Sequence, residues 1–157
     1  MNLSPPLLPF RLRRPSPPRH SRFSGDADRR LRQTLLLLIA SSYADAKSMC
    51  LEHLQGSGFQ VVVALDGAEA VDVARAVRPG LIFMDTWTQS APRLQALRRL
   101  KQDPVTVDIP VVAFVAAHTS DRVEAGWLAA GCADVLIKPC LPEDILLFVL
   151  SRLRMHD

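Results

Sequence analysis

A chain of 157 residues that is 48% apolar and 22% charged can bury one hydrophobic core, and we expect a single globular domain. No run of eighteen apolar residues occurs, which excludes a conventional membrane-spanning helix, and prolines interrupt the short apolar stretch that a secretion signal would need. The three cysteines lack a CxxC or Cys/His spacing, which excludes a zinc motif and, without a secretion signal, favours a cytoplasmic location.

The first 34 residues differ from the rest of the chain in charge and proline content. They hold eight arginines against two aspartates, a net charge of +6, together with six of the twelve prolines. Residues 35–157 carry a net charge of −3, from eleven basic and fourteen acidic residues. We predict that residues 1–34 form a disordered Arg/Pro-rich extension, because they offer little to bury. An extension without a function is the simpler interpretation; contact with nucleic acid or a membrane through this basic tail is the alternative.

From residue 35 the chain alternates between two hydrophobic periodicities. Short apolar runs predict buried strands at 35–40, 59–65, 81–84, 111–116 and 134–137. Helical spacing of apolar residues predicts helices over 45–57, along the stripes 70–77 and 94–100, and over 119–130 and 142–153. Glycine and proline follow or open several of these segments, as at Gly131 and Pro142, and are typical of helix boundaries.

Five short strands that alternate with five helices predict an α/β fold. Strands that are apolar throughout are buried on both faces, so we expect a doubly wound five-stranded parallel sheet within three α/β/α layers. In such sheets the site lies beyond the carboxyl ends of the strands. The residues there are 40–43, 85–87, 115–117 and 138–139, and they include Asp85, a lone acid that directly follows a buried strand.

Four segments carry a family resemblance. They are "RPGLIFMD" at 78–85, "IPVVAFVA" at 109–116, "AAGCADVLIKP" at 129–139 and "LPEDILLFV" at 141–149. On these segments, residues 35–155 resemble the receiver domain of bacterial two-component response regulators. The resemblance implies a flavodoxin-like sheet of strand order 2-1-3-4-5 and makes residues 35–157 the receiver domain. Because no output domain follows residue 157, we expect either a stand-alone receiver or a fragment-like paralogue that acts by contact.

The resemblance also implies a site. Asp85 falls on the position of the phosphoacceptor, which takes a phosphoryl group from a histidine kinase, and Lys138, followed by Pro139, falls on that of the lysine that pairs with it. A magnesium ion held by Asp85 and the main-chain carbonyl of Trp87 is a weak alternative, and otherwise we expect no metal or cofactor.

Several positions depart from the family's pattern. The two acids that usually follow the first strand are Ser41 and Ser42 here, and the switch positions, usually a hydroxyl residue and an aromatic, are Val115 and Val135. The loop after Asp85 reads "TWTQSAP" instead of a Met-Pro-Gly run.

These departures remove negative charge from the predicted site. Asp85 and Lys138 alone sum to zero, whereas magnesium prefers one or two carboxylates in an octahedral shell of oxygens. We therefore expect Asp85 and Lys138 to form an internal ion pair. The leading hypothesis is a pseudo-receiver in two-component signal transduction, which acts by protein–protein contact with little magnesium-dependent phosphorylation. A functional phosphoacceptor in a phosphorelay is the alternative, favoured by the retained Asp85 and Lys138.

An α/β enzyme or nucleotide-binding protein is the third class considered, and we expect no enzyme. The segment after the first strand, "IASSYADAKS", is not a glycine-rich phosphate loop. Ser41, Ser42 and Cys140 could act as nucleophiles, but neither His53 nor His118 is placed near them by sequence. Cys140 could be a redox-sensitive thiol, although a partly buried structural cysteine explains it equally well.

A partner face is suggested by the last two helices. In the family, partners commonly bind the face around the fourth helix, fifth strand and fifth helix, which here includes Trp127, Leu146, Leu147 and Leu150. The stretch "ILLFVL" at 145–150 is apolar on every side, more than one core-facing stripe requires. A histidine kinase, a downstream target or a second copy of the chain could bind there, and an unusually apolar core helix is the alternative.

Overall fold

The sheet has the predicted composition and order. In the computed structural model, which describes residues 35–41, 44, 50–85, 90–116, 121–138 and 140–154, five strands pair in parallel in the order β2-β1-β3-β4-β5. The strands are β1 (Leu36–Ala40), β2 (Gln60–Ala64), β3 (Leu81–Asp85), β4 (Val111–Val115) and β5 (Asp134–Ile137). The predicted flavodoxin-like topology is thus confirmed. The extension predicted at 1–34 lies outside the described residues.

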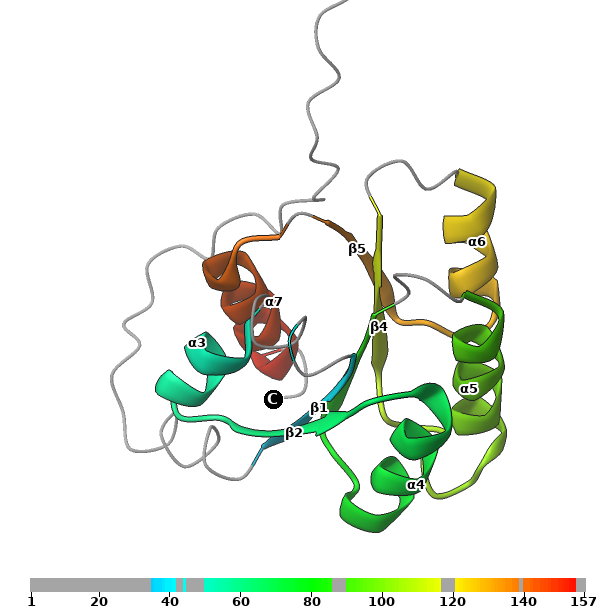
Figure 1. Ribbon diagram of the computed structural model, residues 1–157, viewed down its shortest axis with the longest axis horizontal. Helices are drawn as coiled ribbons and strands as arrows, with labels where there is room; N and C mark the ends of the chain where they lie inside the picture. Colours follow the sequence, from blue (N-terminus) through cyan, green and yellow to red (C-terminus); the bar gives the residue numbers. More distant parts are fainter. Residues whose placement is uncertain are drawn as a thin grey trace, which may run out of the picture.

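Helices cover both faces of this sheet and make the expected three layers (Figure 1). They are α3 (Glu52–Gly56), α4 (Gly67–Val77), α5 (Ser90–Gln102), α6 (Asp121–Ala129) and α7 (Pro142–Arg154). Figure 1 shows α3 and α7 on one face and α4, α5 and α6 on the other. Within the described ranges, none of these helices combines the length and apolar character that crossing a bilayer demands.

Alternation along the strands divides the buried side chains into two cores. In β3, Leu81 and Phe83 join the core under α3 and α7, whereas Ile82 and Met84 join the core under α4, α5 and α6. Nearly every side chain of β1, β3 and β4 is buried, because these strands lie inside the sheet with a helical layer on each face. The apolar runs of the sequence therefore reflect burial on both faces.

Helix α4 shows how local sequence fixes the element boundaries. The side chain of Asp66 accepts a hydrogen bond from the Glu69 amide at 2.8 Å, and Glu69 Oε2 accepts one from the Leu65 amide at 2.9 Å. This arrangement resembles a capping box, except that Glu69 accepts from the amide of the residue before the N-cap. At the other end, Arg78 takes a left-handed conformation (φ 47°) and the helix stops. Val77, expected on the buried stripe, is 43% exposed because it occupies that last turn.

Candidate functional site

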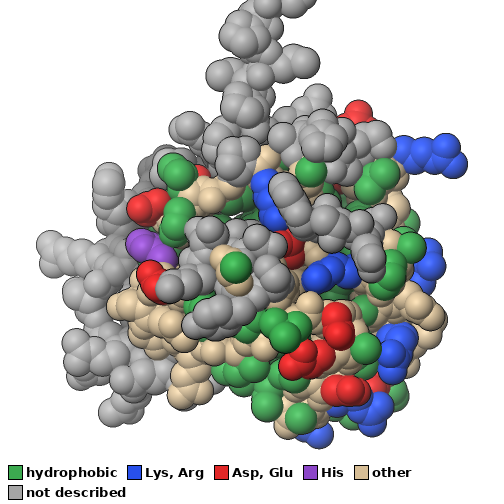
Figure 2. All heavy atoms as spheres, viewed as in Figure 1, with side chains coloured by type: hydrophobic (Ala, Val, Ile, Leu, Met, Phe, Trp, Pro, Cys, Tyr) green, Lys and Arg blue, Asp and Glu red, His purple; other side chains and the backbone are tan. Residues whose placement is uncertain are grey.

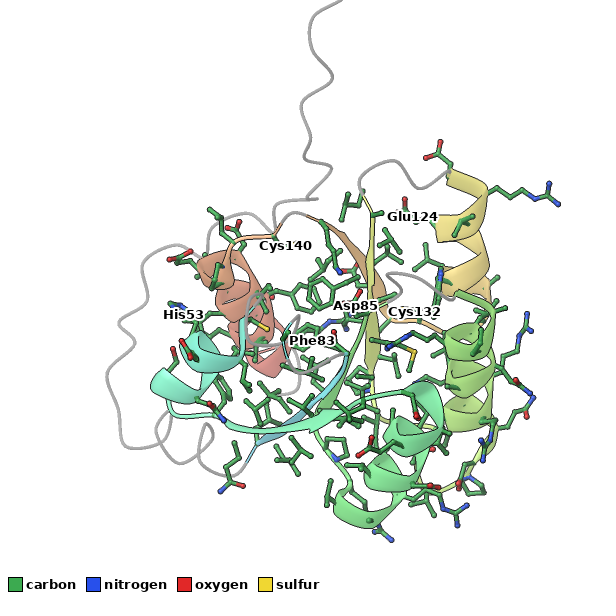
Figure 3. The ribbon with its side chains drawn as sticks, viewed as in Figure 1. His53, Phe83, Asp85, Glu124, Cys132 and Cys140 are labelled. Carbon is green, nitrogen blue, oxygen red and sulfur yellow. The ribbon has the colours of Figure 1, made fainter. Side chains whose placement is uncertain are left out.

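The carboxyl end of β3 carries a buried acid that is paired with a lysine from the end of β5. Asp85 is 2% exposed, and Lys138 Nζ lies 2.6 Å from its Oδ1. The Lys138 amide donates to the Val115 carbonyl at 2.8 Å, so the end of β4 sets the position from which the lysine reaches across to β3. Figure 3 shows Asp85 between the two helical layers. The Asp85–Lys138 ion pair expected from the sequence is present in the structure.

The second oxygen of Asp85 is also engaged, by the residue that follows β1. Ser41 is 1% exposed, and its Oγ donates to Asp85 Oδ2 at 2.9 Å. The Ser41 amide donates to the Ala64 carbonyl at 2.9 Å, which continues the β1–β2 ladder and holds the serine over the edge of the sheet. The structure therefore brings three predicted residues together, Ser41, Asp85 and Lys138. Ser42, Trp87 and Pro139 lie outside the described residues.

This donor set does not fit a magnesium ion. Magnesium needs an octahedral shell of oxygens, usually with one or two carboxylates, and Asp85 is the carboxylate that Ser41 and Lys138 contact. Both of its oxygens accept from protein groups, and one of those groups is an ammonium. No cluster of three or more His, Cys, Asp or Glu side chains that could hold a metal occurs in the part of the chain that the structure describes.

Arg93 is a residue of this edge that our sequence interpretation did not identify. It belongs to the first turns of α5, is half-buried, and donates from Nη1 to the carbonyl oxygen of Ala40 at 2.7 Å. The sequence did contain a pattern that predicts its position. Arg93 lies four residues before Leu97 and seven before Leu100, which is the spacing of one helix face, and both leucines are fully buried. The helical stripe thus places Arg93 on the inward face of α5, just before the buried leucines.

The two degenerate switch positions are apolar and buried. Val115 ends β4 at 2% exposure, and Val135 in β5 is 8% exposed. Both belong to the core under α4, α5 and α6. Neither side chain can donate a hydrogen bond toward Asp85, so this part of the site supplies shape and apolar contact only.

The sheet separates Cys132 from Cys50 and Cys140, which share the core under α3 and α7, and all three cysteines are poorly suited to thiol chemistry. Cys50 and Cys132 are buried, as expected for small core residues, and Figure 3 shows Cys132 on the α5–α6 side and Cys140 on the α7 side. Cys140 is partly buried, and its Sγ donates to the Ile137 carbonyl at 3.1 Å. Burial raises the pKa of Cys140 to about 11 and that of Cys50 to about 12. Because the thiolate is the reactive form, these values argue against a redox-sensitive Cys140.

The predicted partner face needs correction. Trp127 is 2% exposed and packs in the core under α4, α5 and α6, so it is not available to a partner. The large indole fills the space between α6 and the sheet, as apolar burial favours. Leu146 and Leu150 are partly buried against the core under α3 and α7, whereas Leu147 is 52% exposed. Of the four residues expected on this face, Leu147 is therefore the one most exposed to a partner.

Comparison with known proteins identifies the same family along most of the chain. A family model described as the response regulator receiver domain matches residues 38–149. The chain is 29% identical over 121 residues to the DNA-binding response regulator MtrA of Mycobacterium tuberculosis, and the match covers 77% of this chain and 51% of MtrA. It is 32% identical over 111 residues to the phosphate regulon transcriptional regulatory protein PhoB of Escherichia coli, covering 70% of this chain and 48% of PhoB.

Solved structures share the fold. A two-component response regulator from Clostridium difficile matches with a TM-score of 0.69 at 22% identity, over 78% of this chain and 98% of that one. The chemotaxis protein CheY4 of Vibrio cholerae matches with a TM-score of 0.66 at 24% identity, over 75% of this chain and 97% of that one. The chain thus spans nearly the whole of these two solved chains, but about half the length of the curated relatives it matches.

Proposed function

This chain belongs to the response regulator receiver domain family, and from that premise we propose that it is a divergent receiver that signals by protein contact with little magnesium-dependent phosphorylation. Members of this family are signalling modules of two-component systems, so we place the protein in cytoplasmic signal transduction rather than among enzymes. Its partner would be a histidine kinase, a downstream signalling protein or a second copy of the chain.

The state of Asp85 carries this proposal. A phosphoacceptor must offer a carboxylate oxygen to the incoming phosphorus, and here Oδ1 accepts from Lys138 and Oδ2 from Ser41. Both contacts are short and the acid is buried, so the Lys138 ammonium and the Ser41 hydroxyl withdraw charge from the two carboxylate oxygens and lower their nucleophilicity. This geometry favours a structural ion pair between Asp85 and Lys138 over a carboxylate that accepts a phosphoryl group.

The surroundings of Asp85 support the same interpretation. Phosphoryl transfer is catalysed mainly by positioned cations that stabilise charge on the transferring group. The serine at the first acid-pair position is a neutral donor, so the described residues lack the second carboxylate that would help to hold a metal ion. Val115 has no hydroxyl that could contact a phosphoryl group, and Val135 has no aromatic ring that could move in response and change the protein surface. Phosphorylation and its readout are therefore both impaired in our proposal.

Phosphorylation by a small donor tests this function directly. Incubation of the purified protein with labelled acetyl phosphate and magnesium should give little label, because the acceptor is already engaged and no metal assists transfer. We expect at least a hundredfold less label per molecule than in an ordinary receiver, a loss of the order found when a charge-stabilising group is removed. Asp85→Asn is the control for label at other sites. Efficient labelling that disappears in Asp85→Asn would refute the proposal.

A working phosphoacceptor is the second candidate, and one observation favours it. Lys138 points at Asp85 from the end of β5 with its ammonium 2.6 Å from the acid, as a lysine that stabilises a phosphoryl group would. A protein that only binds partners has little evident need for this pair, since a buried ion pair often adds little net stability. The labelling experiment above separates the two candidates.

The contact surface in our proposal lies where α6 and α7 flank the edge strand β5. Leu128 of α6 is 46% exposed and Leu147 of α7 is 52% exposed. On the face viewed in Figure 2, by contrast, acidic side chains gather over α4, whose Glu69 and Asp72 and whose N-cap residue Asp66 are exposed. Exposed leucines are typical of interfaces, whereas a strongly charged surface resists apolar contact. The basic extension predicted for residues 1–34 could add a contact with nucleic acid or membrane.

Self-association through Leu147 is open to measurement. If two copies meet at this face, Leu147→Glu should weaken association by about tenfold or more, because it introduces a charge that would be desolvated in the interface. Analytical ultracentrifugation over the micromolar range reports the change. Leu65→Glu is the matched control, since Leu65 is 58% exposed beside β2, at the opposite edge of the sheet. A wild-type protein that stays strictly monomeric at high micromolar concentration would rule out this self-association.

A further inference from the structure

The carboxyl edge of the sheet holds a second cation besides Lys138. Arg93 of α5 places its guanidinium on the end of β1, where Nη1 donates to the Ala40 carbonyl at 2.7 Å. The next residue is Ser41, whose hydroxyl donates to Asp85. Arg93 thus contacts Ala40, the residue before Ser41, while Ser41 and Lys138 both contact Asp85.

The second cation changes the charge of the site. Asp85 contributes one negative charge, and Lys138 and Arg93 contribute two positive charges, so these three side chains sum to +1. Since Arg93 is half-buried, its charge is less screened by solvent than that of a surface arginine. The guanidinium cannot lose its proton under ordinary conditions, so Arg93 keeps its positive charge in the folded protein.

We infer that Arg93 is the residue that excludes divalent cations from the Asp85 site. This inference rests on the proposed function and adds a cause to it. Because residue 41 is a serine and not an acid, the site has too few carboxylate ligands for a metal ion. The positive charge of Arg93 would repel a metal ion even if an acid were placed at position 41. The guanidinium also contacts the Ala40 carbonyl, at the end of β1.

A merely structural role for Arg93 gives a different expectation. If the arginine only satisfies the Ala40 carbonyl, its replacement would lower stability and leave metal affinity unchanged. If it excludes cations, its effect on affinity should appear once a second carboxylate is present. The two effects of restoring an acid and removing the arginine should then be strongly coupled.

The test is a cycle of Ser41→Asp and Arg93→Gln, with magnesium chloride alone as the ligand. The formal charge of the site is +1 in the wild type, zero in each single variant and −1 in the double variant. Isothermal titration calorimetry should show saturable binding in the double variant, about tenfold or more tighter than in Ser41→Asp alone, a typical size for coupling between nearby charges. Wild type and Arg93→Gln should show no saturable binding below the millimolar range.

Two controls separate charge from shape. Arg93→Lys combined with Ser41→Asp retains the positive charge and should bind magnesium no better than Ser41→Asp alone. Arg98→Gln in the same background removes a charge from an exposed position of α5 and should also leave affinity unchanged. Thermal unfolding of each variant shows that the protein titrated is folded.

The possible failures are distinguishable. If Ser41→Asp alone binds magnesium as tightly as the double variant, Arg93 does not exclude the ion, and the inference falls while the proposed function stands. If the wild type itself binds magnesium below the millimolar range and becomes labelled by acetyl phosphate, the proposed function falls with it.

Discussion

Lys138→Met is expected to lower the free energy of unfolding by about 3 kcal/mol, the loss seen when one partner of a buried ion pair is removed. Asp85 is 2% exposed, so its charge would remain buried with the Ser41 hydroxyl but without the ammonium at 2.6 Å. Lys138 itself is 18% exposed, which places the expected loss at the lower end of the usual range. Urea unfolding followed by circular dichroism measures the change.

A double variant shows whether Lys138→Met loses stability because the charge of Asp85 is no longer balanced or because the packing of the lysine side chain is lost. Asp85→Asn combined with Lys138→Met removes both charges, so the double variant should be more stable than Lys138→Met alone. Arg152→Met is a suitable comparison, because Arg152 is a partly exposed cation that donates to the Ala133 carbonyl at 3.2 Å and should cost less than about 1 kcal/mol. If Lys138→Met loses no more stability than Arg152→Met, the ion pair does not hold the edge of the sheet.

Much of this site could be predicted from the sequence because it follows from topology. Asp85 and Lys138 each stand directly after an apolar run, and parallel strands bring all their carboxyl ends to one edge. The ion pair then follows from two opposite charges at an edge where the sequence supplies few other acids. The loss of the two acids at Ser41 and Ser42 could likewise be seen in the sequence, although the bond from Ser41 to Asp85 could not.

The positions of Trp127 and Arg93 were not predicted, because each depends on the orientation of its helix relative to the sheet. Trp127 was expected on the surface, but α6 turns it inward, and one aromatic in a short helix with exposed Val123 and Leu128 gives no clear stripe. Arg93 was overlooked because an arginine is ordinarily a surface residue. Its spacing from Leu97 and Leu100 places it on the buried face, yet its bond to Ala40 depends on the separation of α5 from β1 in the folded molecule.

Phe83→Ala should produce a larger loss, about 4 kcal/mol of the free energy of unfolding, in the range measured when a buried aromatic is truncated. Phe83 is fully buried two residues before Asp85 on β3. Its ring centroid lies 5.3 Å from that of Phe114 in β4 and 6.3 Å from that of Phe148 in α7. Truncation would therefore leave a cavity between the sheet and α7 and would also remove two aromatic contacts.

Substitutions of graded size test this explanation against a general sensitivity of β3. Phe83→Leu keeps most of the volume and should cost about 1.5 kcal/mol, because a volume-conserving change leaves a smaller cavity. Leu147→Ala removes an exposed side chain of α7 and should change stability by less than about 0.5 kcal/mol. Equal losses for Phe83→Leu and Phe83→Ala would mean that ring geometry, not filled volume, decides the stability of this core. A loss below about 2 kcal/mol for Phe83→Ala would show that α7 can collapse onto the sheet and that the three rings do not fix its position.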